Sequence, residues 1–135
     1  MSRRPRRPPV PPSSPCPCGL PGSYADCCGR LHDGRAPAVT AEQLMRSRYS
    51  AFVVRDEAYL LRTWAADQRP ARVGLDDDRT WTGLEILGHS GGSAFHTEGT
   101  VEFRACYDET GRAGEQRENS RFVRVDGAWV YDRPV

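Results

Sequence analysis

The sequence predicts an α+β domain in which helices pack on one face of a curved antiparallel sheet, preceded by a small N-terminal cysteine knuckle. Apolar side chains recur at helical spacing between residues 40 and 64, whereas they alternate with polar ones, as in strands, from residue 80 onward. Helices followed by a run of strands are typical of α+β domains. Four of the five cysteines fall between residues 16 and 28, in a segment too short for a core of its own.

Two helices are expected before the sheet. Residues 40–43 read Thr-Ala-Glu-Gln, a capping box that starts the first helix. Asp56 is expected to cap a second helix that runs from Glu57 to about Trp64. The buried face of the first helix is predicted to consist of Leu44, Met45, Phe52 and Val53.

Four strands are expected after residue 80. The first spans residues 81–89 and is broken by Gly91-Gly92, and the second spans residues 93–107. After a turn at residues 108–114, a strand over residues 115–125 pairs through Asp126-Gly127 with a strand over residues 128–132. In the second strand one face is predicted to hold Val101, Phe103, Ala105 and Tyr107, and the other Thr100, Glu102, Arg104 and Cys106.

These patterns divide the chain into residues 1–14, a disordered tail; residues 15–35, the knuckle; and residues 36–135, the α+β domain. The tail is rich in proline and carries Arg3, Arg4, Arg6 and Arg7. All 19 basic residues of the chain are arginines, which excludes Schiff-base lysines and the lysine of phosphate-binding loops. A net charge of +1 gives no overall attraction to nucleic acid or to a membrane.

The cysteines form the pairs Cys16-Pro17-Cys18 and Cys27-Cys28, a set of four thiolates that suits a tetrahedral, structural Zn²⁺ ion. Two disulfides are the first alternative, but they are typical of secreted chains. The N-terminus shows no apolar signal segment, so we expect a reducing, cytoplasmic compartment. An iron–sulfur cluster is a second alternative. His32 is expected to be a solvated loop residue, with replacement of Cys28 as the fourth ligand as its alternative role.

A second candidate site lies in the larger domain. Arg46 and Arg48 are two residues apart on a helix, so they cannot share a face. If the strand face of Glu102 and Arg104 coincides with that of Glu118, an Arg–Glu network lines the concave side of the sheet. We expect such charges, including Arg121, to form structural ion pairs between helix and sheet before they form a substrate site.

Two segments resemble known families. Cys16-Pro17-Cys18-Gly19, Tyr24 and Cys27-Cys28-Gly29 resemble the SEC-C zinc motif. The rest resembles the YchJ-like bacterial family, through residues 44–52, Trp81-Thr82-Gly83-Leu84, Gly99-Thr100-Val101-Glu102-Phe103 and residues 118–124. The resemblance implies a cone-shaped domain like nuclear transport factor 2, with a possible cavity, and zinc ligation by Cys16, Cys18, Cys27 and Cys28.

Two functions remain open. A closed four-thiolate site leaves no coordination position for a substrate, which favours a non-enzymatic adaptor that binds another protein through the knuckle. The alternative is a small enzyme or ligand-binding protein that uses the cone, with Glu102 or Glu118 as the acid–base group. No membrane partner is expected, and nucleic acid only as a weak partner of the Arg-rich tail.

Overall fold

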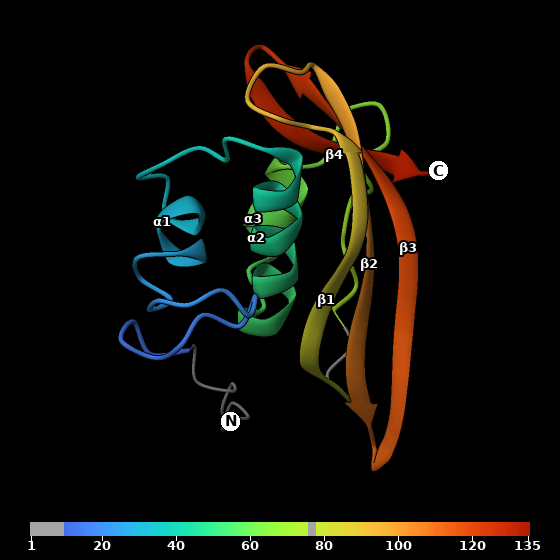
Figure 1. Cartoon of the computed structure of the whole chain (residues 1–135). Helices are drawn as coiled ribbons and strands as arrows, with labels where there is room; N and C mark the ends of the chain where they lie inside the picture. The colour runs from blue at the N-terminus through green and yellow to red at the C-terminus, as the bar shows by residue number, and fades with distance from the viewer. Residues whose placement is uncertain (1–9, 76–77) are drawn as a thin grey trace.

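The computed structural model describes residues 10–75 and 78–135. Figure 1 shows the knuckle with its short helix, the two later helices and the sheet as successive layers, with the two later helices in the middle. The predicted tail over residues 1–14 therefore lies largely outside the described residues. The end of the predicted tail is hydrogen-bonded to the knuckle. The carbonyls of Pro12 and Ser14 accept hydrogen bonds from the amides of Ala25 and Tyr24 at 3.0 and 2.8 Å.

The helices are α1 (Cys28–His32), α2 (Ala41–Val54) and α3 (Glu57–Arg62). Both predicted N-caps are confirmed: the Thr40 side chain accepts a hydrogen bond from the Gln43 amide, and Asp56 accepts one from the Tyr59 amide. α2 ends at Arg55, which takes the left-handed conformation with φ 64°. Thr63 and Trp64 lie beyond α3, so the second helix is shorter than the sequence predicts.

The sheet has four antiparallel strands in the order β1 (Arg79–Gly91), β2 (Glu98–Glu109), β3 (Arg112–Val125) and β4 (Ala128–Pro134). Asp126-Gly127 forms the predicted hairpin turn, with φ of 51° and 83°. The preceding turn is shorter than predicted, because only Thr110 and Gly111 separate β2 from β3. β2 begins later than predicted, because residues 93–97 form a turn. A hydrogen bond from the His96 amide to the Ser93 carbonyl, 3.0 Å long, closes this turn.

The main core lies between α2 and the inner face of the sheet, the face that is turned towards the helices. Val101, Phe103 and Ala105 alternate into this core, as the sequence predicts. Phe122 and Trp129 complete the sheet side, and the Trp129 indole donates a hydrogen bond to the Val39 carbonyl at 3.0 Å. The predicted α+β class is thereby confirmed.

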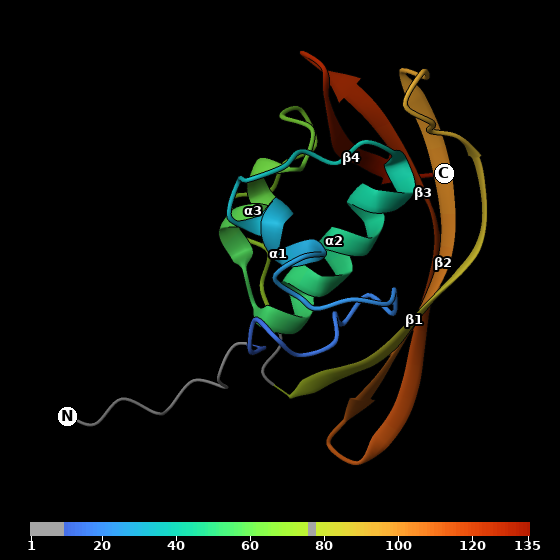
Figure 2. The same ribbon diagram turned by 60° about the vertical axis from the view of Figure 1, so that its left-hand side comes forward.

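β4 also fastens the end of α3 to the sheet. The Ala65 amide donates to the Tyr131 carbonyl at 2.7 Å, and the Tyr131 amide donates to the Thr63 carbonyl at 2.8 Å. Figure 2 shows α2 crossing between the knuckle and the sheet, so that one helix touches both modules. Among the described residues, no helix is long and apolar enough to cross a membrane.

Candidate metal centre

The knuckle is a tight loop that leads into α1. Pro15 and Ser23 form a short antiparallel bridge, and the Cys16 amide donates to the Gly22 carbonyl at 3.2 Å. This loop places the first cysteine pair opposite Cys27 and Cys28, which stand at the N-terminal end of α1. Two pairs that are separated in sequence thus meet at one point.

The four thiols form a compact cluster. The sulfur atoms of Cys16, Cys18, Cys27 and Cys28 all lie within 4.8 Å of one another. The Sγ atoms of Cys18 and Cys27 are 3.7 Å apart, close to the edge of a tetrahedron with metal–sulfur bonds of about 2.3 Å. A disulfide requires about 2.05 Å, and all five cysteines of the chain are free thiols. The arrangement fits a four-thiolate metal site and not the disulfide alternative.

The surroundings shift the pKa values of the Cys16, Cys27 and Cys28 thiols in different directions. Hydrogen bonds from Cys18 and Cys28 lower the pKa of the Cys16 thiol. The pKa of Cys28 is raised, first because its thiol is hydrogen-bonded to Cys16 and Cys18, and burial raises the pKa of Cys27 to about 12. A divalent cation at the centre of the cluster would supply the charge that four thiolates need.

Gly29 sets how closely α1 approaches the loop. Its amide donates to the Tyr24 carbonyl at 2.8 Å, and a Cβ atom at this position would lie 2.7 Å from the same oxygen. No larger residue fits without moving the backbone. Tyr24 itself packs against the cysteine cluster.

The prediction that His32 is a solvated loop residue is wrong. The imidazole is buried in α1, with 9% of the residue exposed. Its Nε2 lies 2.8 Å from the Ser47 carbonyl, which only accepts, so Nε2 carries the proton. Nδ1 then accepts from the Tyr24 hydroxyl at 2.6 Å. Both ring nitrogens are occupied, so His32 is a packed link between knuckle and α2 and not a metal ligand.

The knuckle is docked onto α2 through Ser47 and Ser50, which sequence reasoning missed, and through Arg46, which it placed in a helix–sheet network. The Cys16 thiol lies 3.7 Å from the Ser50 hydroxyl, and Ser47 and Ser50 are fully buried beneath the knuckle. Arg46 donates from Nη1 to the Cys18 carbonyl at 2.7 Å and pairs with Glu42 at 3.0 Å. Small residues at helical i, i+3 spacing are the only sequence signal for this contact.

Arg48 points the other way, into the cone, so the prediction that the two arginines do not share a face is confirmed. Only 5% of the residue is exposed, and Nη1 donates to the Thr63 hydroxyl at 2.7 Å. Its guanidinium stacks between Trp64 and Tyr131, 5.0 Å from each ring centroid. Burial lowers the pKa of Arg48 to about 10, so the side chain remains cationic at neutral pH.

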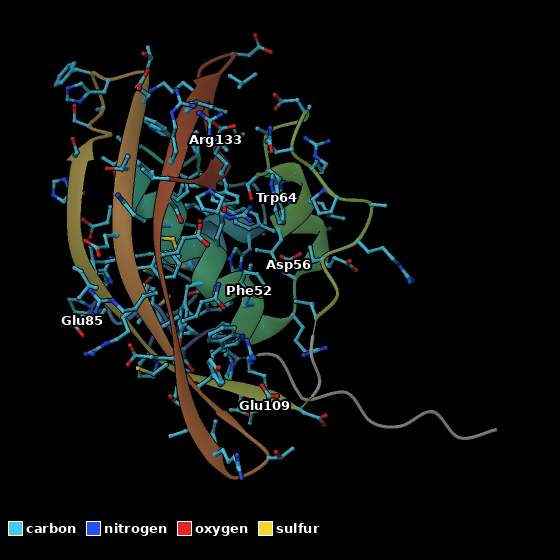
Figure 3. All side chains as sticks on the ribbon, turned by 90° about the vertical axis from the view of Figure 1, so that its right-hand side faces the viewer. Phe52, Asp56, Trp64, Glu85, Glu109 and Arg133 are labelled. Carbon is cyan, nitrogen blue, oxygen red and sulfur yellow. The ribbon has the colours of Figure 1, made fainter. Side chains whose placement is uncertain are left out.

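The condition for an Arg–Glu network on the concave side is not met. Glu118 lies opposite Phe103, so it faces the core, whereas Glu102 and Arg104 face outward. Glu102 pairs with Arg117 at 3.6 Å on this outer face. Arg104 pairs there with Glu85, which is labelled in Figure 3. Glu102 is therefore removed from any acid–base role inside the cone.

Glu118 and Arg121 have separate partners among the described residues and do not pair with each other. The Glu118 carboxylate accepts hydrogen bonds from the Tyr131 hydroxyl at 2.8 Å and the Ser120 hydroxyl at 2.5 Å. Arg121 points outward and pairs with the Asp132 carboxylate. The expected ion-pair network from the first helix through Glu118 to Arg121 is absent from the contacts of the described residues. Arg48 instead stacks on two aromatic rings, and Glu118 accepts hydrogen bonds from neutral hydroxyl groups.

Comparison with known proteins supports this two-part architecture. Residues 40–134 match the family model described as YchJ, middle NTF2-like domain. A UPF0225 protein of Streptomyces coelicolor is 62% identical over 120 residues, which cover 89% of this chain and 94% of the relative.

Two solved structures of SEC-C motif-containing proteins are also similar. The solution structure from Rhodopseudomonas palustris has a TM-score of 0.76 at 30% identity and covers 90% of this chain and 97% of that one. The crystal structure from Psychrobacter arcticus has a TM-score of 0.73 at 29% identity, with coverages of 92% and 83%. The cysteine cluster, the helix-backed sheet and these matches together show that the chain belongs to the YchJ-like UPF0225 family of SEC-C motif proteins.

Proposed function

We propose that the protein is a cytoplasmic adaptor whose knuckle holds one structural Zn²⁺ ion and binds another protein. Zinc is favoured over other metals because four thiolates in a tetrahedral spacing suit a borderline-soft ion without redox chemistry. Four protein ligands leave no position open for a substrate, so the ion stabilises the knuckle and performs no reaction. Free thiols in this number fit a reducing compartment.

The observation that carries the adaptor proposal is a groove of ≈ 560 Å³ between the knuckle and the N-terminal half of α2. Cys27 and Arg30 line it on the knuckle side, and Gln43 lines it on α2. Its rim carries Leu20 and Val39, which are 41% and 53% exposed. Apolar side chains around a concave surface are typical of sites that receive a partner's side chain.

An arginine supplies hydrogen-bond donors to the groove. Arg30 lines it, and a guanidinium group has donors only. An acceptor oxygen on the partner would pair with this side chain. The partner we propose is a protein segment that presents an apolar side chain beside a carboxylate or carbonyl oxygen.

Site-specific photo-crosslinking in bacterial cells tests this. A photoreactive phenylalanine at position 20 should capture a discrete partner, whereas the same residue at position 117, on the outer face of the sheet, should not. Replacing Val39 with Glu should abolish the crosslink and leave the metal content unchanged. Identical crosslinking patterns from positions 20 and 117, or capture that survives the Val39 change, would contradict the proposal.

A further inference from the structure

The four thiols of the cluster are not equally accessible from solution. Cys16, Cys18 and Cys28 are buried, with 4%, 0% and 3% of each residue exposed, whereas Cys27 is only half-buried. Cys27 also lines the groove of ≈ 560 Å³ beside the knuckle, and a groove of this volume admits a small molecule. A reagent from solution therefore reaches the cluster first at Cys27.

The opposite side of the cluster is closed. The Cys16 thiol faces α2, where it lies 3.7 Å from the hydroxyl of the fully buried Ser50. Tyr24 packs against the cluster from the loop. In Figure 2 the knuckle lies on the side of α2 that faces away from the sheet. Reaching Cys16 would thus require the knuckle to leave α2, whereas reaching Cys27 through the groove requires no such movement.

Cys18 is the thiol best placed to react with an oxidised Cys27. Their Sγ atoms are 3.7 Å apart, and both residues line the groove. A disulfide needs about 2.05 Å between the sulfurs, so a small shift of the side chains suffices. Cys28 is less suitable, because Cα atoms of neighbouring residues are about 3.8 Å apart and disulfides typically join Cα atoms roughly 4.4–6.8 Å apart.

We propose that Cys27 is a site of oxidation by hydroperoxides, and that the product is a disulfide between Cys27 and Cys18. The inference rests on the metal centre of the proposed function and not on the adaptor role. A thiol that coordinates a metal ion is deprotonated, so in the metal-loaded protein Cys27 is a thiolate, which is the form that reacts.

Both steps of this oxidation balance with the hydroperoxide as the sole oxidant. The Cys27 thiolate attacks one oxygen, the O–O bond breaks, and hydroxide or alkoxide leaves, so that Cys27 becomes a sulfenic acid. The Cys18 thiolate then attacks this sulfur, the S–O bond breaks, and hydroxide leaves as the S–S bond forms. The two sulfurs lose two electrons in total, and the hydroperoxide accepts both.

The disulfide removes half of the ligand set of the knuckle. Cys16 and Cys28 would remain, and two thiolates are too few for a structural zinc site, which uses four ligands. Cys18 also carries the carbonyl that accepts a hydrogen bond from Arg46, and both oxidised residues line the groove. Release of the metal and a change in the shape of the groove are therefore expected to accompany oxidation.

Treatment of the full-length, zinc-loaded protein with hydrogen peroxide tests the proposal. A chromophoric chelator reports zinc release, and alkylation of the remaining thiols followed by peptide mass spectrometry identifies the oxidised cysteines. The Cys18–Cys27 disulfide should accumulate in step with zinc release, and dithiothreitol with added zinc should reverse both. Dimedone, which traps sulfenic acids, should label Cys27 before the other cysteines of the cluster.

Two variants separate oxidation of Cys27 from loss of the fold. Cys27→His keeps a zinc ligand but has no thiol, so peroxide should release its zinc at least about tenfold more slowly. Cys106→Ser removes the half-buried thiol of β2, which lies outside the cluster, and should release zinc at the wild-type rate. Should Cys27→His fail to hold zinc, the order of labelling in the wild type decides alone.

Four results would overturn this inference and leave the proposed zinc site standing. They are a zinc-loaded chain in which Cys16 or Cys28 is oxidised first, a disulfide from Cys27 to a cysteine other than Cys18, zinc that stays bound while Cys106 is oxidised, and equal zinc release from the wild type and Cys27→His. A purified chain that holds no zinc would overturn both the inference and the proposed zinc site.

Discussion

The guanidinium of Arg46 donates a hydrogen bond to the carbonyl oxygen of Cys18 at 2.7 Å, and this bond joins α2 to the loop that carries two of the four thiols. The same side chain pairs with Glu42 one turn earlier in α2. The geometry of the cysteine cluster is therefore supported by the larger domain and not by the knuckle alone.

Replacing Arg46 with Met should weaken metal binding about tenfold, because residues that orient ligands typically contribute one to two orders of magnitude to affinity. Competition with a chromophoric chelator measures this directly. Arg117→Met, which removes an exposed arginine on the outer face, is the matched control and should bind metal normally. Equal affinities for the two variants would show that the hydrogen bond to Cys18 does not support the site.

Removing residues 1–14 should destabilise the knuckle, whereas removing residues 1–9 removes none of its described contacts. The longer deletion takes away the acceptors of the Ala25 and Tyr24 amides, and each lost backbone hydrogen bond costs about 1 kcal/mol. Amide hydrogen exchange at positions 24 and 25 reports the change locally. We expect faster exchange only in the longer deletion. Unchanged exchange would mean that residues 10–14 do not support the fold.

Gly29→Ala should disrupt the docking of α1 onto the loop, because the added Cβ would lie 2.7 Å from the Tyr24 carbonyl oxygen. Overpacking of this kind costs about 1–3 kcal/mol. Gly83→Ala is the control, since nothing lies within 4 Å of a Cβ there. Urea unfolding, monitored with metal-loaded protein, should show a lower midpoint for the first variant alone. A wild-type midpoint for Gly29→Ala would contradict the close approach.

Burial lowers the pKa of His32 below its usual value of about 6.5. The unfolded chain then binds the proton more readily than the folded one, so this histidine's contribution to stability is complete above pH 7 and is lost as the pH falls below about 6.5. Thermal melts between pH 7.5 and 5 should show a steeper loss of stability for the wild type than for His32→Gln. Parallel curves would show that His32 is not buried in its neutral form.

Local signals in the sequence predicted the parts of the fold that depend on a few neighbouring residues. The caps at Thr40 and Asp56 and the turn at Asp126-Gly127 are chemical features of short segments, and the structure contains all three. The alternation of Val101 and Phe103 into the core is equally local, because successive side chains of a strand point to opposite faces.

The register between β2 and β3 and the docking of the knuckle onto α2 could not be predicted from such local signals. Whether Glu118 shares a face with Glu102 depends on the β2–β3 register, and the two-residue turn sets Glu118 opposite Phe103. His32 looked solvated because its acceptor, the Ser47 carbonyl, lies 15 residues away on α2. The buried serines under the knuckle, Ser47 and Ser50, are marked in the sequence only by their i, i+3 spacing, which does not say what covers that face of the helix.

Native mass spectrometry of the full chain purified without chelator tests the metal-centred account most directly. It should show one zinc ion per chain, and Cys27→Ser/Cys28→Ser should carry none while residues 40–134 keep a folded NMR spectrum. A metal-free chain with four free thiols, or a chain with two native disulfides among Cys16, Cys18, Cys27 and Cys28, would contradict it.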